Sequence, residues 1–173
     1  MRAIPITPWF QRKFPQLSKE FFPGLLERLA GTPVRIREKL ADLPAPVLMH
    51  KPEEGWSILE NLGHLTDLEP LWFGRIDDIR NDQRYLRSAD LTNQKTHTAN
   101  HNSQGLEKLL QAFEAHRSRL IEKLEGLEIA DLDKRARHPR LDTPMTIVDL
   151  LFFVAEHDDH HLATCSMLIA QGS

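Results

Sequence analysis

The sequence predicts an all-α protein folded as a four-helix bundle. Apolar residues recur at helical spacing through most of the 173 residues, whereas the alternation typical of β-strands is scarce. Four such stretches are separated by segments rich in Pro, Gly, Asn and Asp. A chain of this length has room for one sizeable core. We therefore expect a single domain over residues 1–173, in which residues 1–17 form an irregular N-terminal extension that packs on the bundle.

The first helical stretch is expected to run from Ser18 or Pro23 to Leu43, and two prolines follow it. Its apolar face consists of Leu25, Leu26, Leu29, Val34, Ile36 and Leu40. Gly31 and Pro33 interrupt the pattern near its middle. We therefore expect either a kinked helix or two shorter ones.

The second stretch begins at Ser57 and continues to about Arg80. Ser57 and Glu60 have the spacing of a capping box, in which each side chain bonds the backbone N–H of the other residue. The apolar stripe of this stretch consists of Ile58, Leu62, Leu65, Leu68, Trp72, Ile76 and Ile79. Trp72 and Phe73 point to different sides of it. One of them either faces a second copy of the chain, which would make a homodimer, or covers the N-terminal segment.

The third stretch begins near Ser103 and ends near Gly126, with an apolar stripe of Leu106, Leu109, Phe113, Leu120 and Leu124. The fourth opens at 143–146, where Asp149 completes a cap, and runs to about Ala170. The second and third stretches are joined by residues 81–102, a long polar segment that has room for a short helix of its own. The connection 127–142 is shorter, and His138-Pro139 within it indicates a turn.

Composition excludes several classes of protein. The formal net charge is only −3 and the charges are interspersed, so we expect no nucleic-acid partner. No apolar run approaches the roughly 20 residues of a membrane span. The first 15 residues lack the apolar segment of a signal peptide, which favours a cytoplasmic location. Cys165 is the only cysteine, so an intrachain disulfide is impossible.

The fourth stretch contains the most informative pattern. Its core-facing stripe reads Ile147, Leu150, Val154, His157, His161, Cys165 and Leu168. Two histidines thus occupy positions where a bundle expects Leu or Ile. Four residues apart on a helix, they project to the same side one turn from each other, a spacing that lets two imidazoles bind one ion. The alternative is a structural hydrogen-bond network with Glu or Asp on another helix.

A third ligand is expected from His64, on the flank of the second stripe. Three neutral imidazoles leave a coordination position open for water or substrate, as a catalytic metal site requires. Glu60 and Asp67 lie about one turn on either side of His64, and either has the position to orient a ligand ring. For Glu60, the helix cap is the preferred role.

These residues resemble a known family. WSILENLGHL at 56–65, followed by Asp67, Glu69 and Trp72, is similar to the second helix of the DinB/YfiT-like superfamily. MTIVDLL at 145–151, leading into AEHDDHHL at 155–162, resembles its last helix. The similarity covers nearly the whole chain in the order of its elements.

The resemblance implies a bundle of up-down-down-up type with a three-histidine divalent metal site at His64, His157 and His161. It also implies a small-molecule substrate, because relatives include metal-dependent hydrolases, and transferases or isomerases that use low-molecular-weight thiols. We expect one divalent transition metal ion, zinc or nickel. Two alternatives stay open: a non-catalytic metal-binding or ligand-sensing bundle, and a bundle whose histidines serve only packing.

The other candidate side chains receive separate interpretations. His160 lies about 100° from the ligand stripe and is expected at an interface or beside the ligands. His116 falls at a core step of the third stretch and is the reserve for a fourth ligand or a proton-transfer group. Cys165 is expected to pack as a small hydrophobe. Arg117 and Arg119 are expected to be exposed, with a cation for an anionic substrate as the alternative role. His97 and His101 are expected to lie in a solvated loop.

Overall fold

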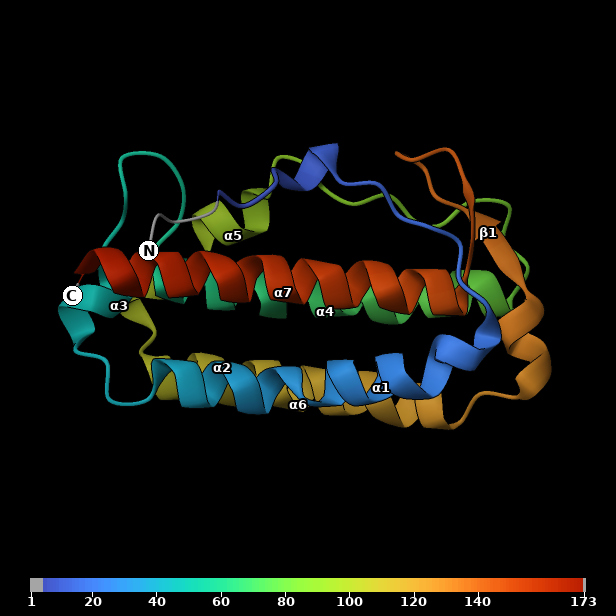
Figure 1. Cartoon of the computed structure of the whole chain (residues 1–173), viewed down its shortest axis with the longest axis horizontal. Helices are drawn as coiled ribbons and strands as arrows, with labels where there is room; N and C mark the ends of the chain where they lie inside the picture. Colours follow the sequence, from blue (N-terminus) through green and yellow to red (C-terminus); the bar gives the residue numbers. More distant parts are fainter. Residues whose placement is uncertain (1–4, 173) are drawn as a thin grey trace.

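The computed structural model describes residues 5–172, and four long helical segments dominate it (Figure 1). The first segment is split into two helices, as Gly31 and Pro33 predicted, and short helices and a hairpin of two three-residue strands occupy the connections. In chain order the elements are α1 (Phe22–Ala30), α2 (Thr32–Leu40), α3 (Ala45–Met49), α4 (Ile58–Arg80), α5 (Gln94–Thr98), α6 (Leu106–Glu125), β1 (Arg135–Arg137), β2 (Pro144–Thr146) and α7 (Ile147–Gly172).

The bundle has the up-down-down-up arrangement. In Figure 1, α1 and α2 run in one direction along the long axis, α4 and α6 both run in the opposite direction, and α7 returns parallel to α1. The helices α4 and α1 do not form a main contact with each other; each packs against α6 and α7. Because α4 and α6 are parallel, residues 81–105 must travel back along the bundle to join them. The predicted fold class is confirmed.

Local sequence signals explain where two of the long helices begin. Ser57 Oγ accepts a hydrogen bond from the backbone N–H of Glu60, and Glu60 accepts one from the N–H of Ser57, which completes the predicted capping box of α4. At α7, Thr146 N–H donates to Asp149 Oδ2 and Asp149 N–H donates to Thr146 Oγ1. These reciprocal bonds satisfy N–H groups that the first helical turn leaves without partners.

The connections on either side of α6 contain features that the sequence did not predict. The helix begins at Leu106, near Ser103 as expected, but Gly105 precedes it and the Ser103 hydroxyl donates to the carbonyl of Asn100 within a 3₁₀ turn. The turn expected at His138-Pro139 is present, and it joins two strands, β1 and β2, which pair antiparallel with Ala136 opposite Met145. Strands of three residues are too short to show alternation, so sequence periodicity does not reveal them.

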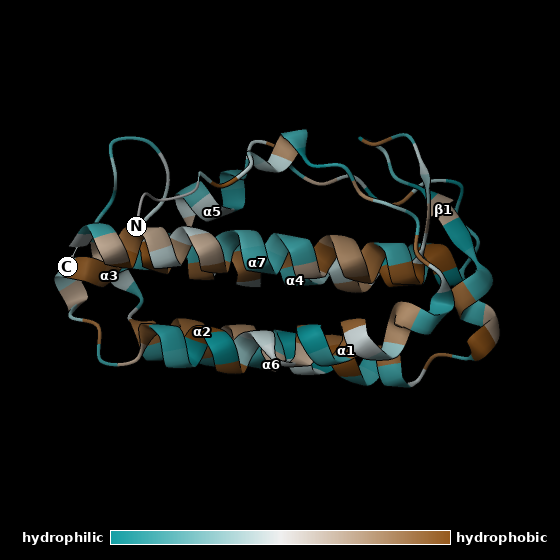
Figure 2. Cartoon of the chain, viewed as in Figure 1, coloured by the Kyte–Doolittle hydropathy of each residue, from teal (hydrophilic) through white to brown (hydrophobic). Residues whose placement is uncertain are grey.

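The core consists of two apolar clusters separated by a buried polar layer. One cluster lies toward the hairpin and includes Leu29, Trp72 and Phe153, and the other lies toward α3 and includes Leu62 and Phe113. Figure 2 shows the same sequence of zones along α7, whose hydrophilic middle lies between more hydrophobic ends. The buried polar residues of the middle zone include Thr32 on α2, Asn61, His64 and Glu69 on α4, Arg117 on α6, and His157, Asp158 and His161 on α7.

The N-terminal segment lies on the outer face of α7. Trp9 packs edge-on against Phe153, with ring centroids 5.0 Å apart, and Leu17 N–H donates to Asp149 Oδ1. Residues 1–4 of the predicted extension lie outside the described residues. Among the helices of residues 5–172, none has both the length and the apolar composition that a membrane span needs.

Gly63 lies where α4 meets the crossover, and its replacement is expected to separate the two. A methyl group at this position would overlap the buried ring of His101. We expect Gly63→Ala to lower the free energy of unfolding by about 1–3 kcal/mol through overpacking. Chemical denaturation followed by circular dichroism measures the change.

Gly24→Ala is the matched control for this prediction. Gly24 is also helical, in α1, and nothing lies within 4 Å of a methyl group there. Removal of a helical glycine at an open position should stabilise the protein by about 0.5–1 kcal/mol. The interpretation of close packing is refuted if both variants change stability in the same direction.

Candidate metal centre

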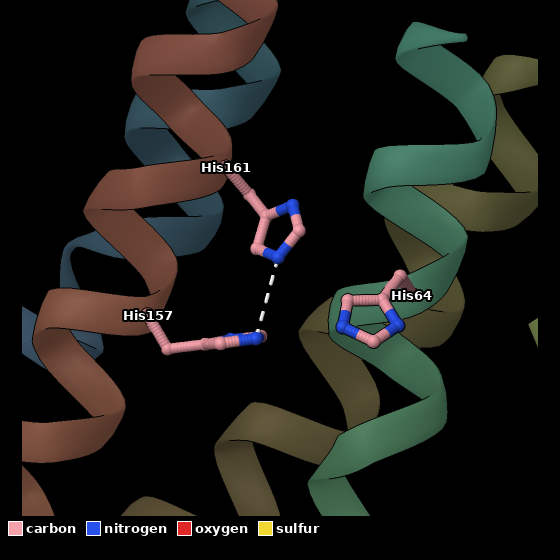
Figure 3. Close-up of side chains that lie close together, drawn as sticks. All are labelled: His64, His157 and His161. Carbon is pink, nitrogen blue, oxygen red and sulfur yellow. Dashed lines mark hydrogen bonds between the residues drawn. The ribbon is translucent and has the colours of Figure 1, made fainter. Parts of the chain in front are cut away.

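Three histidines from two helices converge in the polar layer. His64 projects from α4 toward His157 and His161, which lie one turn apart on α7 (Figure 3). One ring nitrogen of each lies within 4.8 Å of the others, and Nε2 of His157 lies 3.3 Å from Nε2 of His161. All three side chains are at least 94% buried. These are the three residues that the sequence predicted as ligands.

Hydrogen bonds on the far side of two rings set which nitrogen faces the cluster. His161 Nδ1 lies 2.7 Å from Asn61 Oδ1, and the amide of Asn61 donates to the carbonyls of Trp56 and Ser57. The amide oxygen can only accept, so Nδ1 of His161 carries the proton. Its Nε2 therefore presents a lone pair to the centre of the cluster.

A parallel chain of bonds orients His64. Thr96 Oγ1 donates to Asp67 Oδ2 at 3.0 Å, which leaves the hydroxyl oxygen to accept from His64 Nδ1 at 3.1 Å. Nε2 of His64 is therefore also free. Asp67, proposed from the sequence as a residue that orients a ligand ring, acts on His64 through Thr96. It also lies 2.9 Å from Nε2 of His101.

The residues present fit a divalent metal ion. Burial lowers the pKa of His64 to about 4 and lowers the pKa values of His157 and His161 well below their ordinary value, so all three rings are neutral at pH 7. Two nitrogens bound at 2.0–2.1 Å to one tetrahedral ion lie about 3.3–3.4 Å apart, which is the separation of the two Nε2 atoms of α7. Imidazole nitrogen is a preferred ligand of zinc and of other late transition metals.

The third ring has one unexplained atom. Nδ1 of His157 is buried and has no hydrogen-bond partner among residues 5–172. Burial of an unpaired polar atom costs about 1–3 kcal/mol. Metal-bound histidines usually donate their second N–H to a carboxylate, a carbonyl or a water molecule. A partner for His157 Nδ1 is the one such contact that the described protein groups do not supply.

The three histidines lie on the wall of a pocket with a volume of about 520 Å³. This size lies within the range of small-molecule sites. Aromatic side chains form much of its wall, and Trp9, Trp56 and Trp72 all border it. The Trp56 ring lies 4.5 Å from that of His64, and the Trp9 ring lies 4.9 Å from that of His157, centroid to centroid. The cluster is thus buried at the rear and reachable from the pocket.

The structure separates the remaining candidates. His160 is half-buried, borders the pocket and has its Nδ1 3.5 Å from Nη2 of Arg12, so it lies beside the cluster without joining it. Glu60 caps α4 and accepts from Lys51. Cys165 is fully buried in the apolar cluster near α3, and burial raises the pKa of its thiol to about 12. Neither Glu60 nor Cys165 borders the pocket.

His116 does not occupy the predicted core step of α6. It is half-buried and lies outside the pocket wall, whereas its neighbour Arg117 is 1% exposed. The expectation that Arg117 is exposed is therefore wrong. Its guanidinium donates to Glu69 Oε1 at 2.6 Å and to Asp158 Oδ2 at 2.6 Å. Two carboxylates from two other helices thus allow a cation to occupy the centre of the bundle.

The crossover also contradicts the expectation of a solvated loop. His97 is exposed as predicted, although its ring contacts that of Trp56 at 5.7 Å, but His101 is 4% exposed and packs on Gly63. Thr96 is equally buried. Asn61 was not singled out either, and its only sequence signal is a polar residue between apolar positions near a predicted ligand.

Comparison with known proteins identifies a family and a similar solved structure. A family model described as the DinB superfamily matches residues 28–165. Among solved structures, YfiT from Bacillus subtilis superposes with a TM-score of 0.80 over 92% of each chain, at 17% sequence identity. That protein is described as a probable metal-dependent hydrolase with an unusual four-helix bundle topology. The search of curated proteins found no match.

Proposed function

The chain belongs to the DinB superfamily, and from its three-histidine cluster we propose that it is a divalent-metal-dependent enzyme acting on a small molecule. The observation that carries the proposal is that three buried Nε2 or Nδ1 atoms meet at the wall of an open pocket. His64, His157 and His161 would hold the ion, zinc or nickel. The reaction would be hydrolysis or transfer of a low-molecular-weight thiol.

The ion would supply Lewis acidity, which activates water or a thiol at neutral pH. The protein groups keep the ligand atoms unprotonated and aimed at one point. Asn61 and the Thr96–Asp67 pair hold the Nδ1 protons of two rings, so each Nε2 stays available. The indole rings of Trp9 and Trp56 exclude bulk water from the sides of the cluster. His160, which borders the pocket, is placed to exchange a proton with a bound molecule.

The alternative is a non-catalytic metal-binding or ligand-sensing bundle. A structural zinc site is normally closed by four protein ligands. The cluster found within residues 5–172 contains three, and neither Cys165 nor His116 approaches it as a fourth. An incomplete ligand set beside a pocket favours catalysis over a purely structural role.

Metal content and turnover test this proposal together. Elemental analysis of the untagged protein, after chelation and reloading with zinc or nickel, should give about one equivalent per chain. The loaded protein should then hydrolyse a member of a panel of activated esters and amides, or transfer a low-molecular-weight thiol to an electrophile. Stoichiometric metal without turnover on either panel would favour the binding protein, and no metal at all would refute the site.

Thr96 is expected to control metal affinity without touching the ion. Thr96→Val removes the hydroxyl that accepts from His64 and donates to Asp67, so the ring loses its orientation and tautomer. We expect the metal dissociation constant to rise about 10–100-fold, as it does when hydrogen-bond partners of ligands are removed. Competition with a chromophoric chelator measures it.

Thr98→Val is the control for Thr96→Val. Thr98 also lies in α5, is exposed and donates only to carbonyls of its own turn. Its replacement should change metal affinity less than twofold. If both substitutions raise the metal dissociation constant equally, the Thr96 hydroxyl has no specific role, and α5 supports the site only through its folded structure.

A further inference from the structure

The pocket extends away from the histidine cluster toward the hairpin, where its wall is cationic. On α4 the wall includes His64, Trp72 and Arg75, and the rise of a helix separates the first from the last by about 16 Å along the axis. Trp72 lies between the two ends, with its ring 5.7 Å from that of His157 and 5.4 Å from Cζ of Arg75. His138 and Arg140, in the loop between β1 and β2, complete the far end.

Arg75 is a buried cation whose charge is not paired. Its side chain is 1% exposed, and it forms no ion pair with any residue of the described chain. The nearest carboxylate in sequence, Asp78, is occupied by two guanidinium bonds and the backbone N–H of Arg87. Burial lowers the pKa of Arg75 to about 10, which leaves it charged at pH 7. An unpaired buried charge is costly unless a ligand completes it.

Hydrogen-bond donors outnumber acceptors around His138. Its ring is 3% exposed, and when neutral it offers one lone pair and one N–H. The backbone N–H groups of Arg140 and Leu141 both point at Nδ1 from 3.2 Å, while Nη1 of Arg75 lies 3.2 Å from Nε2. If Nδ1 of His138 carries the proton, the two backbone N–H groups face an N–H. If Nε2 carries it, the guanidinium of Arg75 does. At least one donor is therefore left without an acceptor in either tautomer. Burial, together with the charges of Arg75 and Arg140, lowers the pKa of His138 to about 3, so the ring is neutral at pH 7.

Arg140 adds a second cation with a free donor. Its Nη2 is buried and has no hydrogen-bond partner within residues 5–172, and its Cζ lies 5.2 Å from the centre of the Phe10 ring. Asp90 is the one carboxylate among the described residues of the pocket wall, and it already accepts from the backbone N–H groups of Thr92 and Gln94. The far end therefore has two guanidinium groups and an imidazole, and the described pocket wall offers them no free carboxylate.

We propose that Arg75, His138 and Arg140 bind the terminal oxyanion, a carboxylate or a phosphate monoester, of an elongated substrate whose other end reaches the histidine cluster. Guanidinium groups match the geometry of these anions and bind them by charge-assisted hydrogen bonds. The aromatic wall between the two ends suits an apolar body. The inference rests on the proposed function for the reaction at the histidine cluster. The anion site itself depends only on the residues near the hairpin.

The test uses isothermal titration calorimetry to compare charged and neutral probes that share one phenylalkyl body. The probes are 4-phenylbutanoate against 4-phenylbutanamide, and 3-phenylpropyl phosphate against 3-phenylpropanol. In chelator-treated protein, we expect at least one anion to bind about tenfold or more tightly than its neutral partner. The pair with the larger ratio identifies the kind of oxyanion. If the unmodified protein binds the anion and its neutral partner equally tightly in both pairs, the proposal is overturned.

Arg140→Gln should remove the preference for the anion, with Arg135→Gln as the control. Arg135 is exposed on the same hairpin and lies outside the pocket wall, so its replacement should leave the ratio unchanged. A ratio that survives Arg140→Gln overturns the proposal.

Repeating the titrations with the metal-loaded protein distinguishes failure of the distal anion site from failure of the metal site. Anion binding that appears only after metal loading would mean that the oxyanion binds the ion, which supports the metal centre and refutes the distal site. Anion binding that depends on Arg140 in a protein that never takes up metal would keep the distal site and refute the proposed function.

Discussion

Replacement of His161 by alanine is expected to abolish stoichiometric metal binding. The ring supplies one of three converging nitrogens, and its Nε2 lies 3.3 Å from that of His157. Two imidazoles on different helices do not define a high-affinity site, so the metal content should fall from about one equivalent to near zero. Elemental analysis after dialysis against a weak chelator measures the loss, and His157→Ala should behave in the same way.

His160→Ala is the matched control for the ligand variants. His160 lies next to His161 on α7 and borders the same pocket, but its ring is directed toward Arg12 and Trp9. This variant should retain about one equivalent of metal. If His157→Ala and His161→Ala both retain metal, the cluster is not the site, and the histidines serve packing.

Replacement of Arg117 by methionine is expected to cause the largest loss of stability. The variant leaves the carboxylates of Glu69 and Asp158 buried without their cation, and both side chains are at most 2% exposed. Asp158 would keep only the hydroxyl of Thr32 among the bonds that it makes in this layer. Removal of one partner from a buried ion pair costs about 3–5 kcal/mol. Urea denaturation at pH 7 measures the change.

Two further variants show whether this cost comes from unpaired charge. Arg119→Met changes the same kind of residue at an exposed position of α6 and should alter stability by less than about 0.5 kcal/mol. The triple variant Arg117→Met, Glu69→Leu and Asp158→Leu removes the stranded carboxylates and should recover much of the loss. A triple variant that is less stable than Arg117→Met would instead indicate that the layer stabilises mainly by its shape.

Helical periodicity correctly predicted the positions of residues that lie on regular helical stripes. The stripe of α7 placed His157 and His161 one turn apart on a buried face, and the structure has them there. His64 was expected on the flank of its stripe and is 4% exposed, since the neighbouring helices cover that flank as well. The capping signals at Ser57 and Thr146 depend only on residues three apart, which is why sequence was sufficient.

Contacts between segments that are distant in the chain could not be predicted from the sequence. A period of 3.6 residues does not distinguish His116 from Arg117 as the inward position of α6, and the choice depends on carboxylates that two other helices supply. The crossover has no period, so nothing in it indicated that Thr96 and His101 are buried. The cationic end of the pocket is likewise formed by a loop and a helix that are more than 60 residues apart.

The parallel course of α4 and α6 has a thermodynamic consequence for the segment that joins them. Residues 81–105 must span the bundle, and on the way they supply the hydroxyl that bonds His64. Occupancy of the histidine cluster and local opening of this segment are therefore linked equilibria, because metal binding and the closed segment favour the same position of the His64 ring. Metal should slow amide hydrogen exchange in α5 although none of the proposed ligands lies in α5. Conversely, whatever loosens the crossover will release metal.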